Sequence, residues 1–224
     1  MAASSTLVLF DIDGTLLKGA GTHHRDALLE GVRRITGCNA SFDGIDTAGT
    51  LDHNLISLLL RDHGPVDHHM DAIVAECQIV FTMNCTADLS GFVCQGAREV
   101  LCRLQARGAV LGLVTGNLSR IAWHKMELAG LREFFSVGAF SEDGSTRAHL
   151  VQCAVERARN ARLVTHDCRV SHIGDHRNDI EAAKANGFQA VAVASGVMSC
   201  EDLRTFQPDI LVENLAQLDI ARLF

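Results

Sequence analysis

The sequence predicts an α/β protein with a parallel sheet core and an all-helical segment inserted after the first strand. Short uninterrupted apolar runs, typical of strands buried on both faces, alternate with helical apolar stripes from about residue 96 onwards. Between the first and second of these runs, the apolar spacing is helical throughout. Alternating strands and helices imply right-handed crossovers, and therefore parallel strands.

Most of the predicted strands are short apolar runs that end in polar or turn-forming residues. The predicted strands are 7–10, 110–114, 137–140, 170–173, 190–193 and 210–212. Four helices are expected between these strands. Three of them end at a glycine, Gly108, Gly130 or Gly187, and the fourth is indicated by apolar residues at helical spacing over 150–158.

The insertion contains three helical stripes. The first ends near Gly37, a residue type suited to a helix C-terminus. A loop is expected over 42–50, and Asp52 can then cap a second helix that ends at Gly64. The third stripe covers 73–81.

Bulk properties limit the class of function. The chain is 47% hydrophobic and 21% charged, as soluble globular proteins are, and its apolar runs are too short to span a bilayer. We see no secretory signal, so we expect a cytoplasmic protein without a membrane partner. The net charge of −7 argues against a nucleic-acid partner but allows a small phosphorylated one. Eight cysteines without a C-x-x-C pair are interpreted as buried, reduced thiols.

Three predicted strands end in polar residues that can form one site. Asp11 and Asp13 follow the first strand, Thr115-Gly116-Asn117 follows the second, and Asp175 follows the fourth. The carboxyl ends of parallel strands lie at one sheet edge, where ligands bind. Because two nearby carboxylates repel, such a pair binds a cation or takes up a proton.

A fourth carboxylate joins this set. Asp179 lies four residues after Asp175, in the first turn of the following helix, so both face the same side. With Asp11 they offer the hard oxygen ligands that Mg2+ prefers. Helix capping is the alternative for either residue alone, but it does not explain three matching strand ends. Thr115 and Asn117 can likewise cap a helix or hold a phosphoryl oxygen.

These segments resemble the motifs of the haloacid dehalogenase (HAD) superfamily. Asp11-Ile12-Asp13-Gly14-Thr15 resembles its first motif, Thr115-Gly116-Asn117 its second, and Gly174-Asp175 with Asp179 its fourth. The third motif supplies a cation, usually Lys, at a helix start. Arg147 is our candidate, because a guanidinium holds a phosphoryl group bidentately and stays charged. Lys125 and Lys184, in the helices after the second and fourth motifs, are predicted to lie on solvated faces.

The resemblance is closest to the phosphoglycolate-phosphatase-like group, and it implies a Rossmann-like core at 1–17 and 89–224 with a helical cap at 18–88. It implies a Mg2+-dependent phosphatase acting on a small phosphate monoester, phosphoglycolate-like or a sugar phosphate. The oligomeric state is not indicated.

The roles implied by the resemblance concern two aspartates first. Asp11 attacks phosphorus to form an aspartyl-phosphate, and Asp13 protonates the leaving oxygen and then activates water. Mg2+ is held by Asp11, the main-chain carbonyl of Asp13 and Asp175, with Asp179 as a direct or indirect ligand. The phosphoryl group is held by Thr115, Gly116, Asn117 and Arg147.

In such enzymes the cap selects the leaving group. The polar candidates of the cap are His23, His24, Arg25, Thr50, Asp52 and His53. Thr50 and Asp52 are the predicted substrate contacts, although helix capping explains Asp52 nearly as well. The adjacent pair His23 and His24 is interpreted as solvated surface and not as a metal site, because adjacent residues of a helix point in different directions. The low aromatic content, 5% with no tyrosine, favours a small acid or sugar over a nucleotide.

Four alternatives remain. A phosphomutase of this fold shares every motif. A haloacid dehalogenase needs no metal and would leave Asp13, Asp175 and Asp179 unexplained. Asp13 also argues against a phosphonate hydrolase. A non-catalytic binding module is disfavoured because all the expected acids are present.

Overall fold

The computed structural model describes residues 3–61 and 69–224, and in that part of the chain the strands form one six-stranded sheet. Its order is β3-β2-β1-β4-β5-β6, and every neighbouring pair is parallel. The strands are β1 (Ser4–Phe10), β2 (Val110–Val114), β3 (Val137–Ala139), β4 (Val164–Gly174), β5 (Gln189–Val193) and β6 (Ile210–Val212). The predicted α/β class is therefore confirmed.

The strand bounds differ most from prediction at β4, which begins at Val164 rather than at residue 170. The amino-terminal half of β4 is largely exposed, and its register with β1 shifts between Ser4 and Thr6. Only the second half is buried continuously, and it contains the apolar Val170 and Ile173 on either side of the buried polar residues Ser171 and His172. The predicted strand therefore matches the buried half alone.

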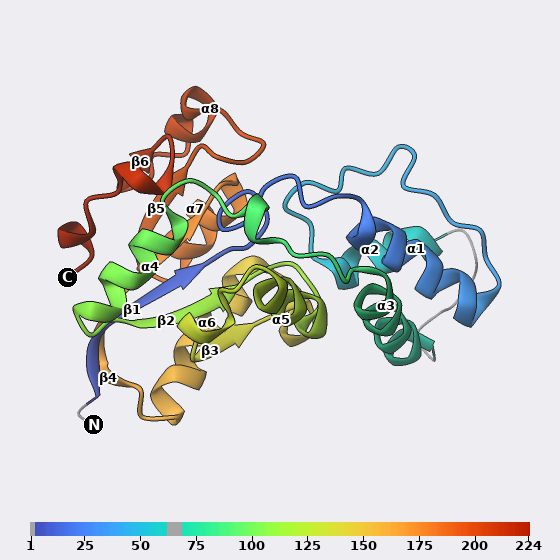
Figure 1. The fold of residues 1–224 in the computed structure, drawn as a ribbon, viewed down its shortest axis with the longest axis horizontal. Helices are drawn as coiled ribbons and strands as arrows, with labels where there is room; N and C mark the ends of the chain where they lie inside the picture. The colour runs from blue at the N-terminus through green and yellow to red at the C-terminus, as the bar shows by residue number, and fades with distance from the viewer. Residues whose placement is uncertain (1–2, 62–68) are drawn as a thin grey trace.

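The core helices cover both faces of the sheet (Figure 1). They are α4 (Ala97–Ala106), α5 (Ser119–Leu128), α6 (Arg147–Asn160), α7 (Arg177–Ala185) and α8 (Cys200–Thr205). Val8 and Phe10 of β1 pack in one apolar cluster with α4 and α5, whereas Leu7 and Leu9 pack in another with α6. Successive side chains of a strand point to opposite faces, so burial on both sides explains the unbroken apolar run. The six-residue α8 was not predicted, because it is too short to show a helical period.

A helical lobe, α1 (His23–Thr36), α2 (Asp52–Leu60) and α3 (Met70–Asn84), lies beyond the ends of the β1, β2 and β3 arrows (Figure 1). As expected, α1 ends at Gly37, which adopts a left-handed conformation with φ of +73°. The predicted capping by Asp52 is wrong: Leu51 occupies the N-cap, and no side chain caps α2. The expected helix end at Gly64 lies outside the described residues. The division into cap and core at 17/18 and 88/89 stays a prediction.

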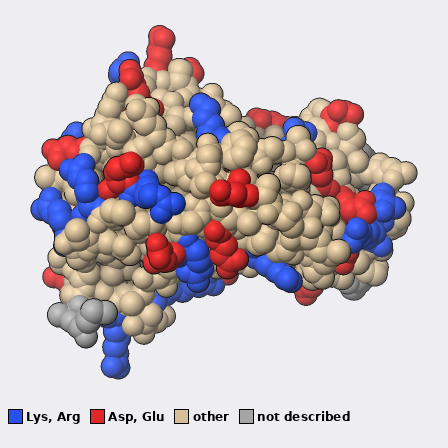
Figure 2. All heavy atoms as spheres, viewed as in Figure 1, with Lys and Arg blue, Asp and Glu red and all other residues tan. Residues whose placement is uncertain are grey.

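The surface carries both acidic and basic side chains, as expected from a composition with 20 Lys and Arg and 27 Asp and Glu. Acidic and basic side chains are interspersed on the face shown in Figure 2. No helix within the described ranges has both the length and the apolarity needed to cross a bilayer. All eight cysteines are free thiols, but only Cys77, Cys85, Cys94 and Cys168 are buried, so the expectation of buried thiols holds for half of them.

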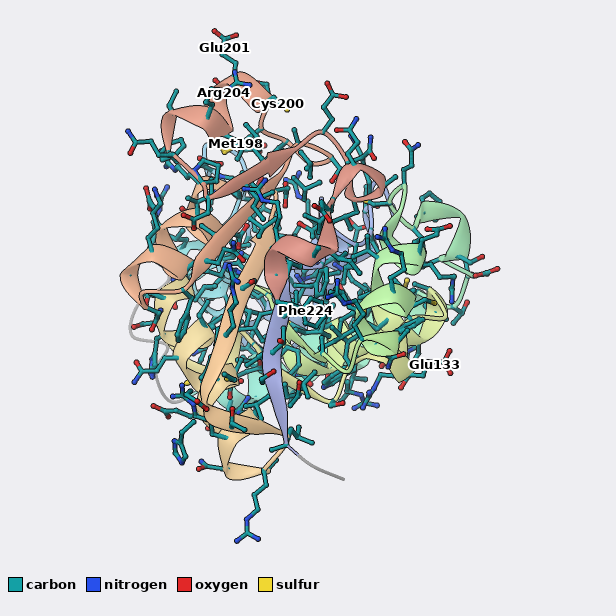
Figure 3. The ribbon with its side chains drawn as sticks, turned by 90° about the vertical axis from the view of Figure 1, so that its left-hand side faces the viewer. Glu133, Met198, Cys200, Glu201, Arg204 and Phe224 are labelled. Carbon is teal, nitrogen blue, oxygen red and sulfur yellow. The ribbon has the colours of Figure 1, made fainter. Side chains whose placement is uncertain are left out.

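The end of the sheet away from the helical lobe is closed by the last residues of the chain (Figure 3). Phe224 lies in the middle of this view, and its main-chain oxygen accepts a hydrogen bond from Arg169 Nη1 at 2.7 Å. The guanidinium of Arg107 lies over its ring, 4.1 Å from the centroid. Leu223 beside it is fully buried. This end is packed, which leaves the opposite, carboxyl end of the strands as the open one.

Two glycines at the ends of α4 allow a matched stability test. Gly96 and Gly108 both have φ of +81°, but a Cβ at Gly96 would overlap the backbone of Ala216, whereas a Cβ at Gly108 meets nothing within 4 Å. Gly108→Ala should cost about 1–2 kcal/mol of unfolding free energy from the left-handed backbone alone. Gly96→Ala should cost about 1–3 kcal/mol more, from overpacking. Urea unfolding of both variants measures this, and equal losses would contradict the packing assignment.

Candidate active site

The carboxyl ends of β1, β2 and β4 meet at one cavity, as the sequence predicts. Asp11, Thr115 and Asp175 line this cavity of about 350 Å³. After Asp13 the chain turns at Gly14, whose φ is +88° and whose N–H donates to the Leu17 carbonyl at 2.7 Å. A side chain at Gly14 would overlap the Asp175 carboxyl, so a residue without a side chain is required there.

Three buried carboxylates form an acidic cluster, Asp11, Asp175 and Asp179. One oxygen from each lies within 4.8 Å of the others. Burial raises the pKa of Asp11 to about 6, an effect partly offset by Arg147. Burial, reinforced by the charges of Asp11 and Asp179, raises the pKa of Asp175 to about 8. Both shifts arise because negative charges are crowded together away from water.

Arg147 provides the positive charge next to this cluster. It is the first residue of α6 and is buried; its Nη1 donates to Asp11 Oδ1 at 3.1 Å, and its Nε lies 3.4 Å from Asp179 Oδ1. Burial alone would raise the pKa of Asp179, but the Arg147 guanidinium, together with His172 and the main-chain N–H of His176, outweighs burial and lowers the pKa. When all three carboxyls are ionised, one guanidinium leaves two negative charges unbalanced. A divalent cation would neutralise them, and oxygen donors suit Mg2+, so the residues fit the metal that the sequence predicts.

Lys125 is the largest correction to the sequence prediction. It was expected on a solvated face, but it is buried, and its Nζ donates to both carboxylate oxygens of Asp13, at 2.8 and 2.7 Å. The signal was present in the sequence: Lys125 follows Ile121 by four residues and Ala122 by three, on the buried face of α5. Lys184 is exposed, as predicted.

Asp13 lies outside the acidic cluster and faces the cavity with 48% of its side chain exposed. Enclosure by the protein acts to raise the pKa of Asp13. The Lys125 ammonium and the hydrogen bonds from Lys125 and Asn117 act in the opposite direction and more strongly, so the pKa falls to about 2. Asn117 Nδ2 donates to Asp13 Oδ2 at 2.8 Å. The structure therefore holds Asp13 as a carboxylate between a lysine and an amide.

The segment after β2 lies between the acidic cluster and the helical lobe. Thr115 is fully buried, and its hydroxyl oxygen accepts from Asn117 Nδ2 at 3.0 Å. A Cβ at Gly116 would lie 3.0 Å from the carbonyl oxygen of Thr50 and 3.5 Å from Arg147 Nη2. These residues line the cavity beside Asp11, but their role towards a phosphoryl group stays a prediction.

The predicted cap residues divide into two groups. Thr50, Asp52, His24 and Arg25 line the cavity, whereas His23 is exposed elsewhere and the main-chain N of His53 donates to Ser141 Oγ. The surface interpretation is therefore wrong for His24. The Asp52 carboxylate is already engaged: Oδ2 accepts from Leu118 N at 2.8 Å and lies 2.7 Å from His24 Nε2.

Sequence reasoning missed four further contacts to the acidic cluster. Thr15 Oγ1 donates to Asp175 Oδ1, and Val197 N donates to Asp175 Oδ2, both at 3.3 Å. His172 Nε2 lies 3.3 Å from Asp179 Oδ1, and His176 N donates to Asp179 Oδ2 at 3.2 Å. Two of these donors are main-chain N–H groups, which no residue type in the sequence reveals.

The comparison with known proteins decides the family. A family model described as haloacid dehalogenase-like hydrolase matches residues 6–187. The chain belongs to this family. The match covers β1 through α7 and thus every HAD motif named above.

Curated HAD relatives match part of their length. Phosphoglycolate phosphatase of Escherichia coli K12 is 27% identical over 132 residues, which cover 59% of this chain and 52% of that protein. Pyrophosphatase PpaX of Oceanobacillus iheyensis is 28% identical over 120 residues, 54% of this chain and 55% of that protein. The chain thus spans about half the length of the curated relatives it matches.

Solved HAD structures share the fold over nearly the whole chain. CbbY from Rhodobacter sphaeroides, in complex with xylulose-(1,5)bisphosphate, has a TM-score of 0.75 at 19% identity and covers 97% of this chain and 98% of its own. β-Phosphoglucomutase from Clostridium difficile has a TM-score of 0.71 at 15% identity, covering 99% and 95%. At these identities, the likeness establishes the fold.

Crowding in the acidic cluster predicts an unusual pH dependence of stability. Without metal, the folded protein retains a proton on Asp175 up to about pH 8, whereas an aspartate in the unfolded chain loses it near its ordinary value of 3.8. The folded state therefore binds more protons between these limits, so its free energy of unfolding falls as pH rises. We expect a fall of more than about 1.4 kcal/mol, the equivalent of one pKa unit, between pH 5 and pH 8.

Urea unfolding in EDTA measures this fall. A divalent cation such as Mg2+ should raise the stability at pH 8 if it binds the folded cluster and not the unfolded chain. Asp175→Asn should flatten the dependence, while Asp202→Asn on α8 should leave it unchanged. An identical slope in wild type and Asp175→Asn would contradict the assignment.

Proposed function

We propose that this chain is a Mg2+-dependent phosphatase that hydrolyses a small-molecule phosphate monoester through an aspartyl-phosphate intermediate. The observation that carries the proposal is the acidic cluster with Arg147 at the floor of a cavity that Asp13 also faces. Family membership and the phosphatase names of the curated relatives support it.

In the proposed first step, a carboxylate oxygen of Asp11 attacks phosphorus and the ester oxygen leaves with the bonding electrons. Asp13 gives that oxygen a proton, so an alcohol is released. The pKa of Asp13, low beside Lys125, rises when a phosphate dianion lies next to it, because like charges favour the neutral form, and Asp13 then takes up the proton that it gives. In the second step, Asp13 removes a proton from water, which attacks phosphorus and restores Asp11.

The residues proposed to hold Mg2+ are Asp11, Asp175, the main-chain carbonyl of Asp13 and, directly or through water, Asp179. When bound, the cation neutralises charge on the phosphoryl oxygens and on the cluster. Arg147 contacts Asp11 and is placed to hold a phosphoryl oxygen beside it. Thr115, Gly116 and Asn117 are proposed to hold the other oxygens through hydroxyl, amide and main-chain N–H groups.

The helical lobe is proposed to act as a cap, comprising residues 18–88, over a core of 1–17 and 89–224. Lys18, His24 and Arg25 bring basic side chains to the cavity, and Thr50 lies at its roof. Among the described residues that line it, there is no Phe, Trp or Tyr to stack on a nucleobase. These features support a small phosphorylated acid or sugar, such as phosphoglycolate, as substrate.

The first test is phosphate release from p-nitrophenyl phosphate. Wild-type protein should release phosphate with Mg2+ and lose this activity in EDTA. Asp11→Asn should lower kcat about 1,000-fold or more, because it removes the nucleophile. Asp167→Asn, an exposed aspartate on β4, is the matched control and should keep wild-type activity.

Activity that persists in EDTA or in Asp11→Asn would reject the aspartate-based mechanism. A panel of phosphate esters that includes phosphoglycolate then defines the substrate. A phosphomutase would instead interconvert sugar phosphates without matching release of inorganic phosphate.

A further inference from the structure

Lys125 carries a buried charge that the proposed chemistry does not use. Its side chain is 4% exposed, and its ammonium contacts Asp13, which lines the catalytic cavity. Nζ contacts Asp13 Oδ1 and Oδ2, Asn117 Oδ1 at 2.7 Å and His24 Nδ1 at 3.1 Å. A buried lysine is costly unless every proton finds an acceptor, and here three groups supply them.

The contact with His24 extends the network into the helical lobe. An ammonium has protons and no lone pair, so His24 Nδ1 must accept, and the proton of neutral His24 is on Nε2. That N–H points to Asp52 Oδ2, which also accepts from Leu118 N. His24 lies on α1 and Asp52 on α2, whereas Asp13 and Lys125 belong to the core. Lys125 thus joins Asp13 to two helices of the proposed cap.

Two donors fix the orientation of the Asp13 carboxylate. Lys125 Nζ contacts both oxygens, and Asn117 Nδ2 contacts Oδ2. Because Asp13 is otherwise exposed to the cavity, without these donors its side chain is free to rotate away from the ester oxygen. A proton donor must lie within hydrogen-bond reach of the leaving oxygen, so orientation limits its effect.

We propose that Lys125 is a positioning residue that holds Asp13 towards the leaving oxygen and, through His24 and Asp52, links that alignment to the docked helical lobe. The inference rests on the proposed phosphatase chemistry. It assigns to Lys125 a role in leaving-group protonation, distinct from holding the phosphoryl group, which belongs to Arg147.

The test compares two esters that differ mainly in their leaving group. Phenyl phosphate expels the more basic phenolate and needs a proton donor, whereas p-nitrophenyl phosphate expels a weaker base and needs little help. The kcat/KM values report the steps up to loss of the leaving group. Their ratio for the two esters does not depend on how much of a variant is folded, so partial unfolding does not confuse the result.

Lys125→Met should lower kcat/KM for phenyl phosphate at least 10-fold more than for p-nitrophenyl phosphate, since general acid catalysis contributes about 100- to 10,000-fold. Lys125→Gln, which keeps one donor, should show a smaller selective loss, and His24→Gln a smaller one still. Asp13→Asn should show the same selectivity, and adding Lys125→Met to it should cost little more. Lys184→Met, an exposed lysine of α7, should match wild type on both esters.

An equal loss on both esters would mean that Lys125 is only structural and would overturn the inference, as would no loss or additive losses in the double variant. Failure of the proposed function gives a different result: wild-type protein would then release no phosphate from p-nitrophenyl phosphate.

Discussion

The electrostatic repulsion among Asp11, Asp175 and Asp179 is the constraint on which this site depends. One oxygen from each lies within 4.8 Å of the others in a buried position, and among the described residues Arg147 is the permanently charged cation that contacts them. Such crowding destabilises the folded chain unless a cation or a proton is bound. The fold tolerates it because the three residues are fixed by separate rigid elements: β1, the end of β4 and the first turn of α7.

Packing around the cluster enforces this arrangement. A Cβ at Gly14 or Gly196 would overlap the carboxyl of Asp175, so both neighbouring segments approach it with backbone alone. The Ser195 hydroxyl donates to the Gly14 carbonyl at 2.7 Å and ties the two segments together. The loop after β5 thus fixes the position of the Asp175 carboxylate, which directly follows β4. The main-chain geometry of the two segments therefore preorganises the charge of the site.

The helical lobe is joined to the core by hydrogen bonds at several points around the cavity. Asp52 N donates to the Gly116 carbonyl at 2.8 Å, and Asn178 Nδ2 donates to the Gly49 carbonyl at 2.9 Å. Glu142 accepts from Gln78 of α3 and from Ser119 at the start of α5. These bonds place the lobe over the strand ends, so it shapes the volume above the acidic cluster. A further contact engages the carboxylate of Asp52, a predicted substrate contact: Oδ2 accepts from Leu118 N at the start of α5.

The sequence by itself determined the sheet and the position of the acids. Burial on both faces demands unbroken apolar runs, and parallel strands bring their carboxyl ends together, so Asp11, Thr115 and Asp175 could be assigned to one edge. Arg147 followed from the resemblance to the third HAD motif, which supplies a cation at a helix start. Tertiary structure alone decided which partners these residues have. Lys125 pairs with Asp13, and His24 with Asp52, across 112 and 28 residues of chain, because helix packing brings them together. The apolar spacing of α5 contained a signal that Lys125 is buried, although the prediction placed it on a solvated face. Its partner depends on distances that sequence spacing does not contain.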